Sequence, residues 1–459
     1  MGSKWVHAKL GGYIDSNLGK MLDQNKNKGD FHPYLGNSNV RWGYFDLENL
    51  SLMKFEEHES DRYGIRKGDL IICEGGEPGR CAIWEDDVPN MKIQKALHRV
   101  RPLPGLTSEY LYYWFLYFGR TGQLDAYFTG TTIKHLTGKA LSELPIEIPP
   151  IDEQKHISMV LGSLDTKIKA NRKINKTLEQ MSQTLFKSWF VDFDPVIDNA
   201  LDAGNPIPEA LQTRAKLRQK VRNSADFKPL PAEIRSLFPS EFEETELGWV
   251  PKGWNISLAG EEFIVKGGST PSTANEDFWI NGTIHWTSPK DLTGNQSKVL
   301  LDTAKKITPL GLTKISSGLL PVNTVLMSSR APIGYLAISK VPMAINQGYI
   351  AIPSTKHLSP EYTIYWLDNI MDDIKGMAGG TTFAEISKSA FKTIKLLIPS
   401  SDIITEFSRI TRNHIDMVVQ NTKEIDSLTN LRDTLLPKLI SGELSLDDLP
   451  DLSTDTEAA

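Results

Sequence analysis

The chain has 459 residues, of which 40% are hydrophobic and 24% are charged. At about 150 residues per domain, this length predicts two to four domains. The composition excludes a collagen-like or largely disordered chain. Cys73 and Cys81 are its only cysteines, too few for a disulfide framework or a Cys-rich metal site, so we expect a reducing cytoplasm. We find no run of about 18 apolar residues, so the sequence predicts no membrane span and no membrane partner.

The net charge of −6 comes from the end of the chain. Segment 441–459 has six acidic residues and no Lys or Arg, and without it the 57 acidic residues fall to 51, equal to the 51 basic ones. A nucleic-acid-binding protein usually has a basic excess. DNA binding by this chain would therefore depend on local groups of charge, or on a partner protein. We expect the acidic tail to be flexible.

The first 150 residues predict a mixed α/β domain. Short apolar runs such as residues 70–72 lie between Gly- and Pro-rich turns, which is typical of strands. Residues 110–115 predict a helix, whose aromatic side chains we assign to the core and not to a platform for nucleic-acid bases. A last strand near 144–148 ends at Pro149.

A long amphipathic helix is predicted over residues 152–190. Asp152 and Glu153 suit a first helical turn. Apolar residues then recur at steps of three and four, which is the spacing of a coiled-coil seam. They are Ile157, Leu161, Leu164, Ile168, Leu178, Leu185 and Trp189. At about 1.5 Å per residue the helix would be about 58 Å long.

Residues 192–250 predict an irregular linker. It contains six prolines, too many for a regular core: Pro195, Pro206, Pro208, Pro229, Pro231 and Pro239. Within it, residues 209–223 predict a short basic helix. This helix is either a strap over the coiled coil or a docking surface for another protein.

The second half of the chain repeats the first at an offset of 250 residues. Gly130-Thr131-Thr132 aligns with Gly380-Thr381-Thr382, and residues 141–157 align without gaps with 391–407. Further upstream the offset changes, as loop insertions would produce. We align three further pairs there: 68–80 with 323–335, Gln94 with Gln347, and 41–47 with 285–292. The period is too long for a solenoid and predicts two homologous domains.

A second long helix is predicted over residues 402–436, ended by Pro437. Asn171 and Asn421 are equivalent under the offset, and both occupy seam positions. A buried Asn in a seam determines register and partner, so we expect the two helices to pair with each other. Because residues 191–250 must join the two domains, we expect the pairing to be antiparallel. The alternative is that each helix packs on its own domain. We assign the register to Asn171, Asn421, Leu164, Ile168, Val418 and Leu428.

The expected fold is therefore α/β, with mixed α and β elements. Two homologous globular domains are separated by two long antiparallel coiled-coil helices, in a pseudo-twofold internal repeat. We divide the chain into six segments: 1–150, 151–191, 192–250, 251–399, 400–440 and 441–459.

The motifs of common enzymes are missing from the sequence. It has no phosphate-binding Gly-x-x-x-x-Gly-Lys-Ser/Thr loop, no Gly-x-Ser-x-Gly elbow and no His-Glu-x-x-His zinc motif. The Asn/Asp-Pro-Pro-aromatic pattern of amino-methyltransferases is absent as well. We therefore predict a binding or scaffold protein without catalytic or metal-binding residues.

Basic and amide side chains beside the turns are candidates for contact with DNA. Arg and Gln can bond base edges, whereas Lys mostly neutralises phosphate. The candidates are Arg41, Arg80, Lys92, Gln94 and Lys134 in the first domain and Arg330, Tyr335, Gln347 and Lys388 in the second. Residues 167–176 also carry five basic residues and no acid, as either a binding face or an ordinary solvated one.

Four segments resemble the specificity (S) subunits of type I restriction–modification systems. They are IPPIDEQKHISMVLGSLDTKI at 148–168, FKSWFVDFDPV at 186–196, ELGWVPKGW at 246–254, and LRDTLLPKLISGEL at 431–444. The repeat of a domain followed by a helix, and the two Gly-Thr-Thr segments, agree with this family. The resemblance extends over nearly the whole chain, although the two domains match mainly in their framework.

The resemblance implies two target recognition domains, 1–150 and 251–399, each reading half of a bipartite double-stranded DNA site. The helices would set the distance between the half-sites, which should differ because the loops of the domains match poorly. Regions 151–250 and 400–444 would bind two methyltransferase subunits, which carry S-adenosylmethionine and methylate adenine N6.

Restriction subunits that use ATP and Mg would complete the complex. This chain would bind no cofactor and catalyse nothing. The alternatives are an assembly scaffold for other proteins, and part of a single-chain restriction–modification enzyme.

Overall fold

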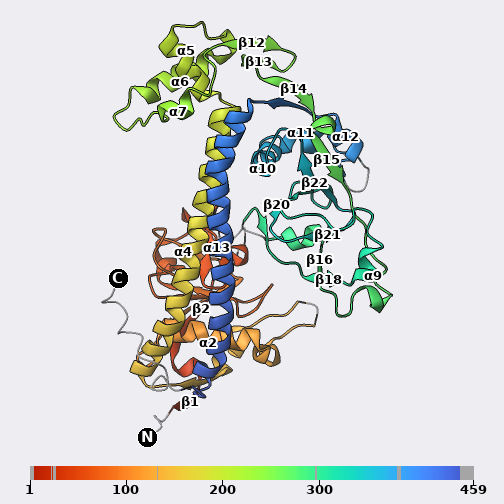
Figure 1. The fold of residues 1–459 in the computed structure, drawn as a ribbon. Coiled ribbons are helices and arrows are strands. Elements are labelled where there is room, and N and C mark those ends of the chain that lie inside the picture. The colour runs from red at the N-terminus through yellow and green to blue at the C-terminus, as the bar shows by residue number, and fades with distance from the viewer. Residues whose placement is uncertain are drawn as a thin grey trace, which may run out of the picture. The chain divides into compact units, whose positions relative to one another are not determined.

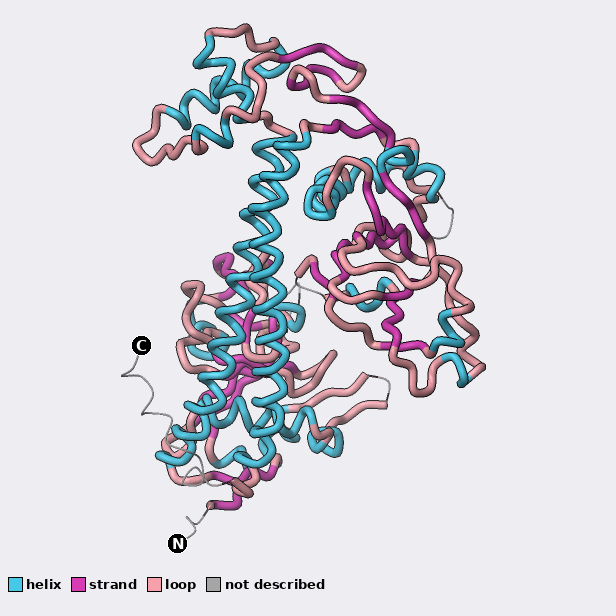
Figure 2. Tube along the Cα trace, in the orientation of Figure 1, coloured by secondary structure: helices cyan, strands magenta, loops and turns pink. Residues whose placement is uncertain are grey.

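The computed structural model describes residues 5–21, 23, 27–131, 133–294, 297–379 and 384–444. The chain divides into two compact units, one of residues 1–168 and 426–459 and the other of residues 169–425. Thr132 of the first Gly-Thr-Thr segment, the whole of the second and nearly all of the acidic tail lie outside the described residues. Figures 1 and 2 show the course of the chain.

The first unit contains four small sheets, one of which is the short pair of β4 (Val40–Arg41) with β5 (Tyr44–Phe45). The largest is antiparallel, in the order β2 (Ile14–Leu18), β10 (Leu97–Pro102), β7 (Leu70–Cys73) and β8 (Cys81–Ile83). The next has β3 (Asp30–Leu35) between antiparallel β6 (Ser51–Phe55) and parallel β9 (Lys92–Ile93). In the third, β1 (Val6–Lys9) pairs with β11 (Pro145–Ile148).

Two helices of this unit begin at a side-chain cap. Thr107 accepts a hydrogen bond from the Tyr110 amide at the start of α2 (Ser108–Arg120), and Thr137 does the same for α3 (Gly138–Glu143). The shorter elements are α1 (Ser60–Tyr63), β4 (Val40–Arg41), β5 (Tyr44–Phe45), and 3-10 turns at Leu10–Gly12, Asn37–Asn39, Glu57–Glu59 and Gln123–Tyr127.

The second unit repeats these pairings. Its largest sheet has the order β15 (Phe263–Lys266), β22 (Tyr349–Thr355), β19 (Val325–Ser328), β20 (Leu336–Ser339) and β17 (Val299–Leu300). In its second sheet, β16 (Ile284–Thr287) lies between antiparallel β18 (Lys305–Ile307) and parallel β21 (Met343–Ile345). Finally, β14 (Asn255–Leu258) pairs with β23 (Lys395–Ile398).

The helices of this domain are short. They are α8 (Ala259–Glu262), α9 (Pro309–Leu312), α10 (Pro360–Asn369), α11 (Met371–Gly376) and α12 (Lys388–Lys392), with 3-10 turns at Glu276–Phe278 and Pro289–Leu292. Ser359 caps α10 in the place where Thr107 caps α2.

The predicted duplication is confirmed by these shared pairings and by a close contact present in both units. A Cβ atom on Gly11 would lie 2.8 Å from the Cβ of Ser142, and one on Gly260 would lie 2.9 Å from the Cβ of Lys392. Because neither glycine could carry a side chain without displacing its neighbour, the same packing requirement has been kept in both halves.

Two of the predicted alignments are wrong. The Gln94 amide donates to the Leu35 carbonyl as the Asn346 amide donates to that of Thr287, so Gln94 corresponds to Asn346 and not to Gln347. The same bonds make β16 the equivalent of β3, so 285–292 corresponds to 33–40 and not to 41–47. Strand pairing determines these equivalences, whereas the short sequence matches can be aligned at more than one offset.

Two long helices, α4 (Ile151–Phe190) and α13 (Ser401–Ile440), extend the predicted ranges slightly. The expectation that Pro437 ends the second helix is wrong. Proline removes its own N–H donor and crowds the carbonyl four residues earlier, but it leaves the donors that follow it intact. The Ser441 amide still donates to the Pro437 carbonyl (3.0 Å). The burial of Leu436, Leu439 and Ile440 in the core of the first unit stabilises this last turn.

The two helices pair antiparallel, as predicted. In the second unit, the Asn421 side-chain amide donates to the Asn175 Oδ1 (2.8 Å), and Ser182 bonds His414 (2.8 Å). In the first unit, Arg432 donates to Asp165 (2.7 Å). Residue numbers rise along one helix as they fall along the other.

The predicted linker folds onto the end of α4 in the second unit, where Trp189 packs against Phe238 (ring centroids 5.0 Å apart). Its elements are α5 (Asp194–Ala203), α6 (Gln212–Arg222), α7 (Ala232–Arg235), a 3-10 turn at Glu209–Leu211, β12 (Phe242–Thr245) and β13 (Gly248–Pro251).

The basic helix predicted at 209–223 is α6, and its arginines pair with acids of α5. Arg214 bonds Asp194 (2.8 Å), and Arg218 bonds Asp198 (2.9 Å). These side chains hold the two helices together, so they are not available for docking another protein.

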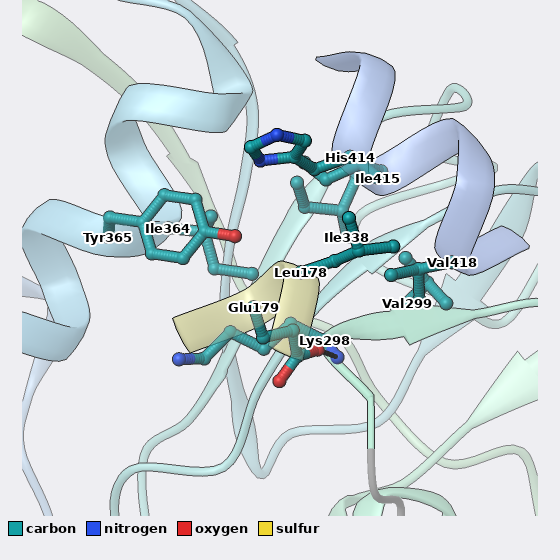
Figure 3. A pocket seen from close by; sticks show the side chains of 10 residues that line it. All are labelled: Leu178, Glu179, Lys298, Val299, Ile338, Ile364, Tyr365, His414, Ile415 and Val418. Atoms are coloured by element: carbon teal, nitrogen blue, oxygen red, sulfur yellow. Dashed lines mark hydrogen bonds between the residues drawn. The ribbon is translucent and has the colours of Figure 1, made fainter. Parts of the chain in front are cut away.

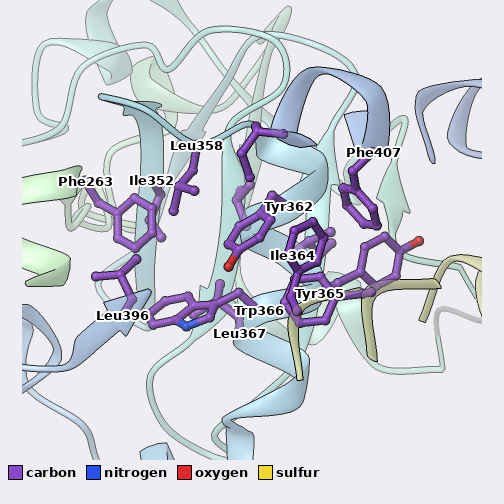
Figure 4. Packing of buried hydrophobic residues seen from close by; sticks show 14 of the residues in the cluster. Phe263, Ile352, Leu358, Tyr362, Ile364, Tyr365, Trp366, Leu367, Leu396 and Phe407 are labelled. Atoms are coloured by element: carbon purple, nitrogen blue, oxygen red, sulfur yellow. The ribbon is translucent and has the colours of Figure 1, made fainter. Parts of the chain in front are cut away.

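The aromatic stretches belong to the core, as predicted. Every residue of 110–115 is at most 7% exposed, and every residue of 362–367 is at most 5% exposed. In the second unit, Tyr362, Tyr365 and Trp366 of α10 lie among Phe263, Leu396 and Phe407 (Figure 4). Of the helices in the described residues, none is both long enough and apolar enough to cross a membrane.

Candidate DNA interface

In the first unit, three turns meet at the ends of strands. The Leu136 amide donates to the Glu74 carbonyl (2.7 Å), and the Glu74 amide donates to the Ala96 carbonyl (2.8 Å). These bonds join the β7–β8 turn (74–80), the turn after β9 and residues 133–136. We call this group the first turn cluster.

Arg80 is the best-positioned candidate of the first turn cluster. Its guanidinium donates to Glu77 (2.8 Å) and to the Asn37 carbonyl (3.0 Å). Glu77 in turn accepts a hydrogen bond from the Trp42 indole (2.7 Å). A guanidinium held from two sides loses little further freedom when it bonds a base or a phosphate, which suits recognition.

The sequence did not reveal Asn37, Trp42 and Glu77 as parts of this network. Asn37 and Trp42 are far from Arg80 in the chain, and no local pattern connects them. Among the described residues, the buried Asn37 Oδ1 and Arg80 Nε have no hydrogen-bond partner. One acceptor and one donor of the network therefore remain without a hydrogen bond beside the candidate interface.

The other candidates of the first unit lie around this arginine. Arg41 is partly exposed and donates to the Val40 carbonyl (3.0 Å). Lys134 is exposed, 3.4 Å from Asp125. The Gln94 side chain accepts a hydrogen bond from the Ala96 amide (3.3 Å).

Lys92 does not suit contact with DNA. Its side chain is buried, and its Nζ donates to the Ser60 hydroxyl (3.1 Å). Burial lowers its pKa, because the charged form loses hydration. Both residues of β9 are buried, and Lys92 lies against α1 and Gly64, which residue type alone did not indicate. We therefore remove it from the candidates.

The second unit has an equivalent group of turns, made of the β19–β20 turn (329–335), the turn after β21 and residues 384–386. We call this group the second turn cluster. The Ile386 amide donates to the Ser329 carbonyl (3.1 Å), and the Ser329 amide donates to the Gly348 carbonyl (2.8 Å). These bonds match those at Leu136, Glu74 and Ala96 in the first unit. The same framework thus presents turns at the same strand ends in both domains.

The candidate side chains of the second turn cluster differ in their contacts. Arg330 is partly exposed and pairs with Glu385 (3.6 Å). Gln347 is exposed and accepts a hydrogen bond from Thr270 (2.8 Å). Tyr335 packs partly against the buried cluster around Tyr349. The remaining candidate, Lys388, is exposed, and its Nζ lies 2.9 Å from where a Cβ of Gly267 would be.

Equivalent positions of the two turn clusters carry different chemistry. Arg80 corresponds to Tyr335, because β7–β8 and β19–β20 share one register. Arg330 corresponds to Gly75, which pairs with His135 as Arg330 pairs with Glu385. The two domains therefore offer different side chains on matching backbones.

The predicted register residues lie along the helix pair. Ile168, Asn171 and Val418 are buried, whereas Leu164, Asn421 and Leu428 are partly buried. Asn171 and Asn421 do not bond each other: Asn171 donates to Glu424 (2.8 Å), and Asn421 donates to Asn175. The partner of each Asn depends on the antiparallel register, which sequence spacing alone does not determine.

A small cavity lies where α10 meets the helix pair in the second unit (Figure 3). Its lining includes Glu179, Tyr365 and His414, and its volume of about 10 Å³ suits a single water rather than a cofactor. Burial raises the pKa of Glu179, whose carboxylate accepts a hydrogen bond from the Lys298 amide. Among the described residues, no group of three or more His, Cys, Asp or Glu could hold a metal ion.

Comparison with known proteins agrees with this architecture. Residues 2–180 and 251–429 each match the family model of the type I restriction modification DNA specificity domain. The type I restriction enzyme HindI specificity subunit of Haemophilus influenzae is 27% identical over 403 residues, covering 83% of this chain and 87% of the relative. The MjaIX specificity subunit of Methanocaldococcus jannaschii is 32% identical over 193 residues, or 42% of this chain and 44% of the relative.

A solved structure shares the fold. The S subunit of a type I restriction–modification system from M. genitalium aligns over 98% of both chains, with a TM-score of 0.53 and 17% identity. The two family matches together cover more than half of the chain, one on each side of the linker. The chain therefore belongs to the family of type I restriction–modification DNA specificity subunits, whose members recognise DNA and are not themselves catalytic.

Proposed function

We propose that this chain reads an asymmetric bipartite DNA site, with one half-site for each turn cluster. The observation that carries the proposal is that matching turns, held by matching backbone bonds, present different side chains in the two units. A shared backbone suits a shared mode of binding, and different side chains suit different bases. The six segments predicted from the sequence are part of this proposal.

In this proposal the paired helices measure the distance between the half-sites. Each helix has 40 residues, which is about 60 Å at about 1.5 Å per residue. That length exceeds one turn of B-DNA, about 34 Å. The hydrogen bonds of Asn171, Asn175 and Asn421 oppose sliding of one helix along the other, because a shift would leave buried amides without partners.

The helices also recruit two methyltransferase subunits in this proposal. Met181 of α4 and Leu431 of α13 are equivalent under the 250-residue offset, and they are 51% and 47% exposed. An exposed large apolar residue on each of two related helices suits two copies of one partner. These partners would bind S-adenosylmethionine and methylate adenine N6, and restriction subunits with ATP and Mg would join them in the cytoplasm.

The measuring role can be tested by lengthening both helices. Seven residues are inserted into α4 after Asn175 and seven into α13 before Asn421, which keeps the seam in phase. We expect methylation to move to sites whose spacer is longer by about 3 base pairs, since seven residues add about 10.5 Å. The half-sites should stay the same.

The control replaces seven exposed residues of these helices without changing their length, and its spacer should equal that of the wild type. Changed half-sites with an unchanged spacer would contradict the measuring role. A purified complex with methyltransferase that retained no specific DNA at high salt would instead favour a scaffold for protein assembly.

A further inference from the structure

The middle of α4 carries a basic face that the turn clusters do not explain. Lys169, Arg172 and Lys173 are exposed, and within the described part of the chain their side chains form no hydrogen bond or ion pair. They lie at the centre of a helix that runs from Ile151 to Phe190. We call these three residues the basic belt.

The basic belt is separated from the seam. At about 100° per residue, Lys169, Arg172 and Lys173 gather on one side of α4, roughly 120° around the helix from the buried Asn171 and Asn175. The exposed Ile174 lies on yet another side, beyond the belt. The belt is therefore distinct from the contact with α13 and from the exposed apolar side chains.

The same side of α4 meets the second recognition domain about two to three turns beyond Arg172. Glu179 accepts a hydrogen bond from the Lys298 amide (2.5 Å), and Gln183 donates to Asp368 (2.7 Å). These two residues lie at nearly the same angle around α4 as Arg172. The belt thus continues, along the helix, the side that carries the second turn cluster's domain.

The belt does not follow from the repeat. The positions of α13 equivalent to Lys169, Arg172 and Lys173 are Val419, Thr422 and Lys423. Pairing with α13 does not account for it either, since the described residues give it no acidic partner. A group of cations on one helix only, on the side of a DNA-reading domain, is complementary to a polyanion.

We infer that the basic belt contacts the phosphate backbone of the DNA between the two half-sites. This inference rests on the proposed function, because the middle of the helices lies beside the spacer only if the two domains hold the half-sites. Lys and Arg at phosphates contribute affinity without reading sequence. The belt would therefore bind a spacer of any base sequence, and it would not affect which half-sites are recognised.

The test uses the full chain in complex with its methyltransferase subunits. The belt variant carries Lys169→Gln, Arg172→Gln and Lys173→Gln. The control, Lys216→Gln with Lys220→Gln and Lys228→Gln, removes the same charge from exposed lysines in and after α6. Binding to a duplex containing the mapped site is measured against salt concentration, together with the methyltransferase content of each complex.

Each phosphate contact contributes about 0.9 to the slope of log K against log salt. We expect the belt variant to keep its methyltransferase subunits and its half-sites but to lose about 2 to 3 from that slope, whereas the control keeps the wild-type slope. Neutral methylphosphonates in the spacer should weaken binding by the wild type and not by the belt variant.

An unchanged slope in the belt variant would overturn the inference, and so would loss of the methyltransferase subunits, which would identify the belt as a protein-binding face. Both results leave a wild-type complex that still retains its bipartite site, so the proposed function would survive them. A wild-type complex that bound no such site would instead contradict the proposed function.

Discussion

The two ends of the helix pair are held to their domains by different chemistry. In the first unit, the Tyr113 hydroxyl donates to Asp165 (2.9 Å), which pairs with Arg432 (2.7 Å). In the second, Tyr365 takes the place of Tyr113, and Ser182 and Ile415 take the places of Arg432 and Asp165. Ser182 bonds His414, the neighbour of Ile415 (2.8 Å). A duplicated framework has thus kept one tyrosine and replaced a buried ion pair by neutral groups.

The first junction contains a buried ion pair and therefore depends on charge. Breaking a buried ion pair leaves the remaining charge without compensation, which costs far more than losing one neutral hydrogen bond. The first junction should therefore be sensitive to loss of one partner, and the second should be sensitive to acid.

Arg432→Ala should have the largest effect on stability. We expect a loss of about 3 kcal/mol in the free energy of unfolding of the first unit, because Asp165 would remain buried and unpaired. Denaturant unfolding, monitored by hydrogen exchange in both units, measures this loss of stability. Arg409→Ala removes an exposed arginine of the same helix and should change nothing measurable. A similar loss in both variants would contradict the distinction.

Arg330→Ala tests the difference between the turn clusters. We expect it to relax one position of the second half-site by about 1–3 kcal/mol, because a bidentate base contact would be lost. Arg80→Ala should instead relax a position of the first half-site. Methylation of randomised sites by each complex measures both. Uniform weakening over all sequences would identify the arginine as a phosphate contact.

Ser182→Ala should destabilise the second junction by about 1 kcal/mol, the usual value of a neutral hydrogen bond. Hydrogen exchange along residues 178–186 provides the measurement, with Arg432→Ala as the comparison. A loss as large as that of Arg432→Ala would show that the two junctions are equally dependent on their polar groups.

Acid should weaken the second junction. Burial lowers the pKa of His414 below its usual 6.5, so the folded state holds fewer protons on this residue than the unfolded state. Its contribution to stability is complete above about pH 6.5 and is lost as the pH falls towards the folded pKa. Hydrogen exchange at pH 7 and below 6 measures the effect.

His414→Gln removes the titrating group and should reduce the pH dependence of exchange around Ser182. An equal pH dependence in wild type and variant would exclude His414 as its source.

Much of the architecture could be predicted from sequence because it depends on repeated local patterns. Three–four spacing indicated both long helices, and the constant offset indicated two related domains. The aromatic stretches were correctly assigned to the core, since a helix that is apolar on every side is normally buried.

Side-chain partners could not be predicted in the same way. The burial of Lys92 depends on the elements that cover β9, among them α1 with Ser60, and the network of Asn37, Trp42 and Arg80 joins distant parts of the chain. The extension of α13 past Pro437 depends on packing by residues that follow it. Such features follow from contacts made only in the folded chain.

The central claim is that two related but different readers act at a constant separation. Mapping methylated adenines across the genome of cells that express the intact complex tests it most directly. We expect one asymmetric motif of two different half-sites with a constant spacer. A continuous motif, or two identical half-sites in inverted orientation, would contradict it.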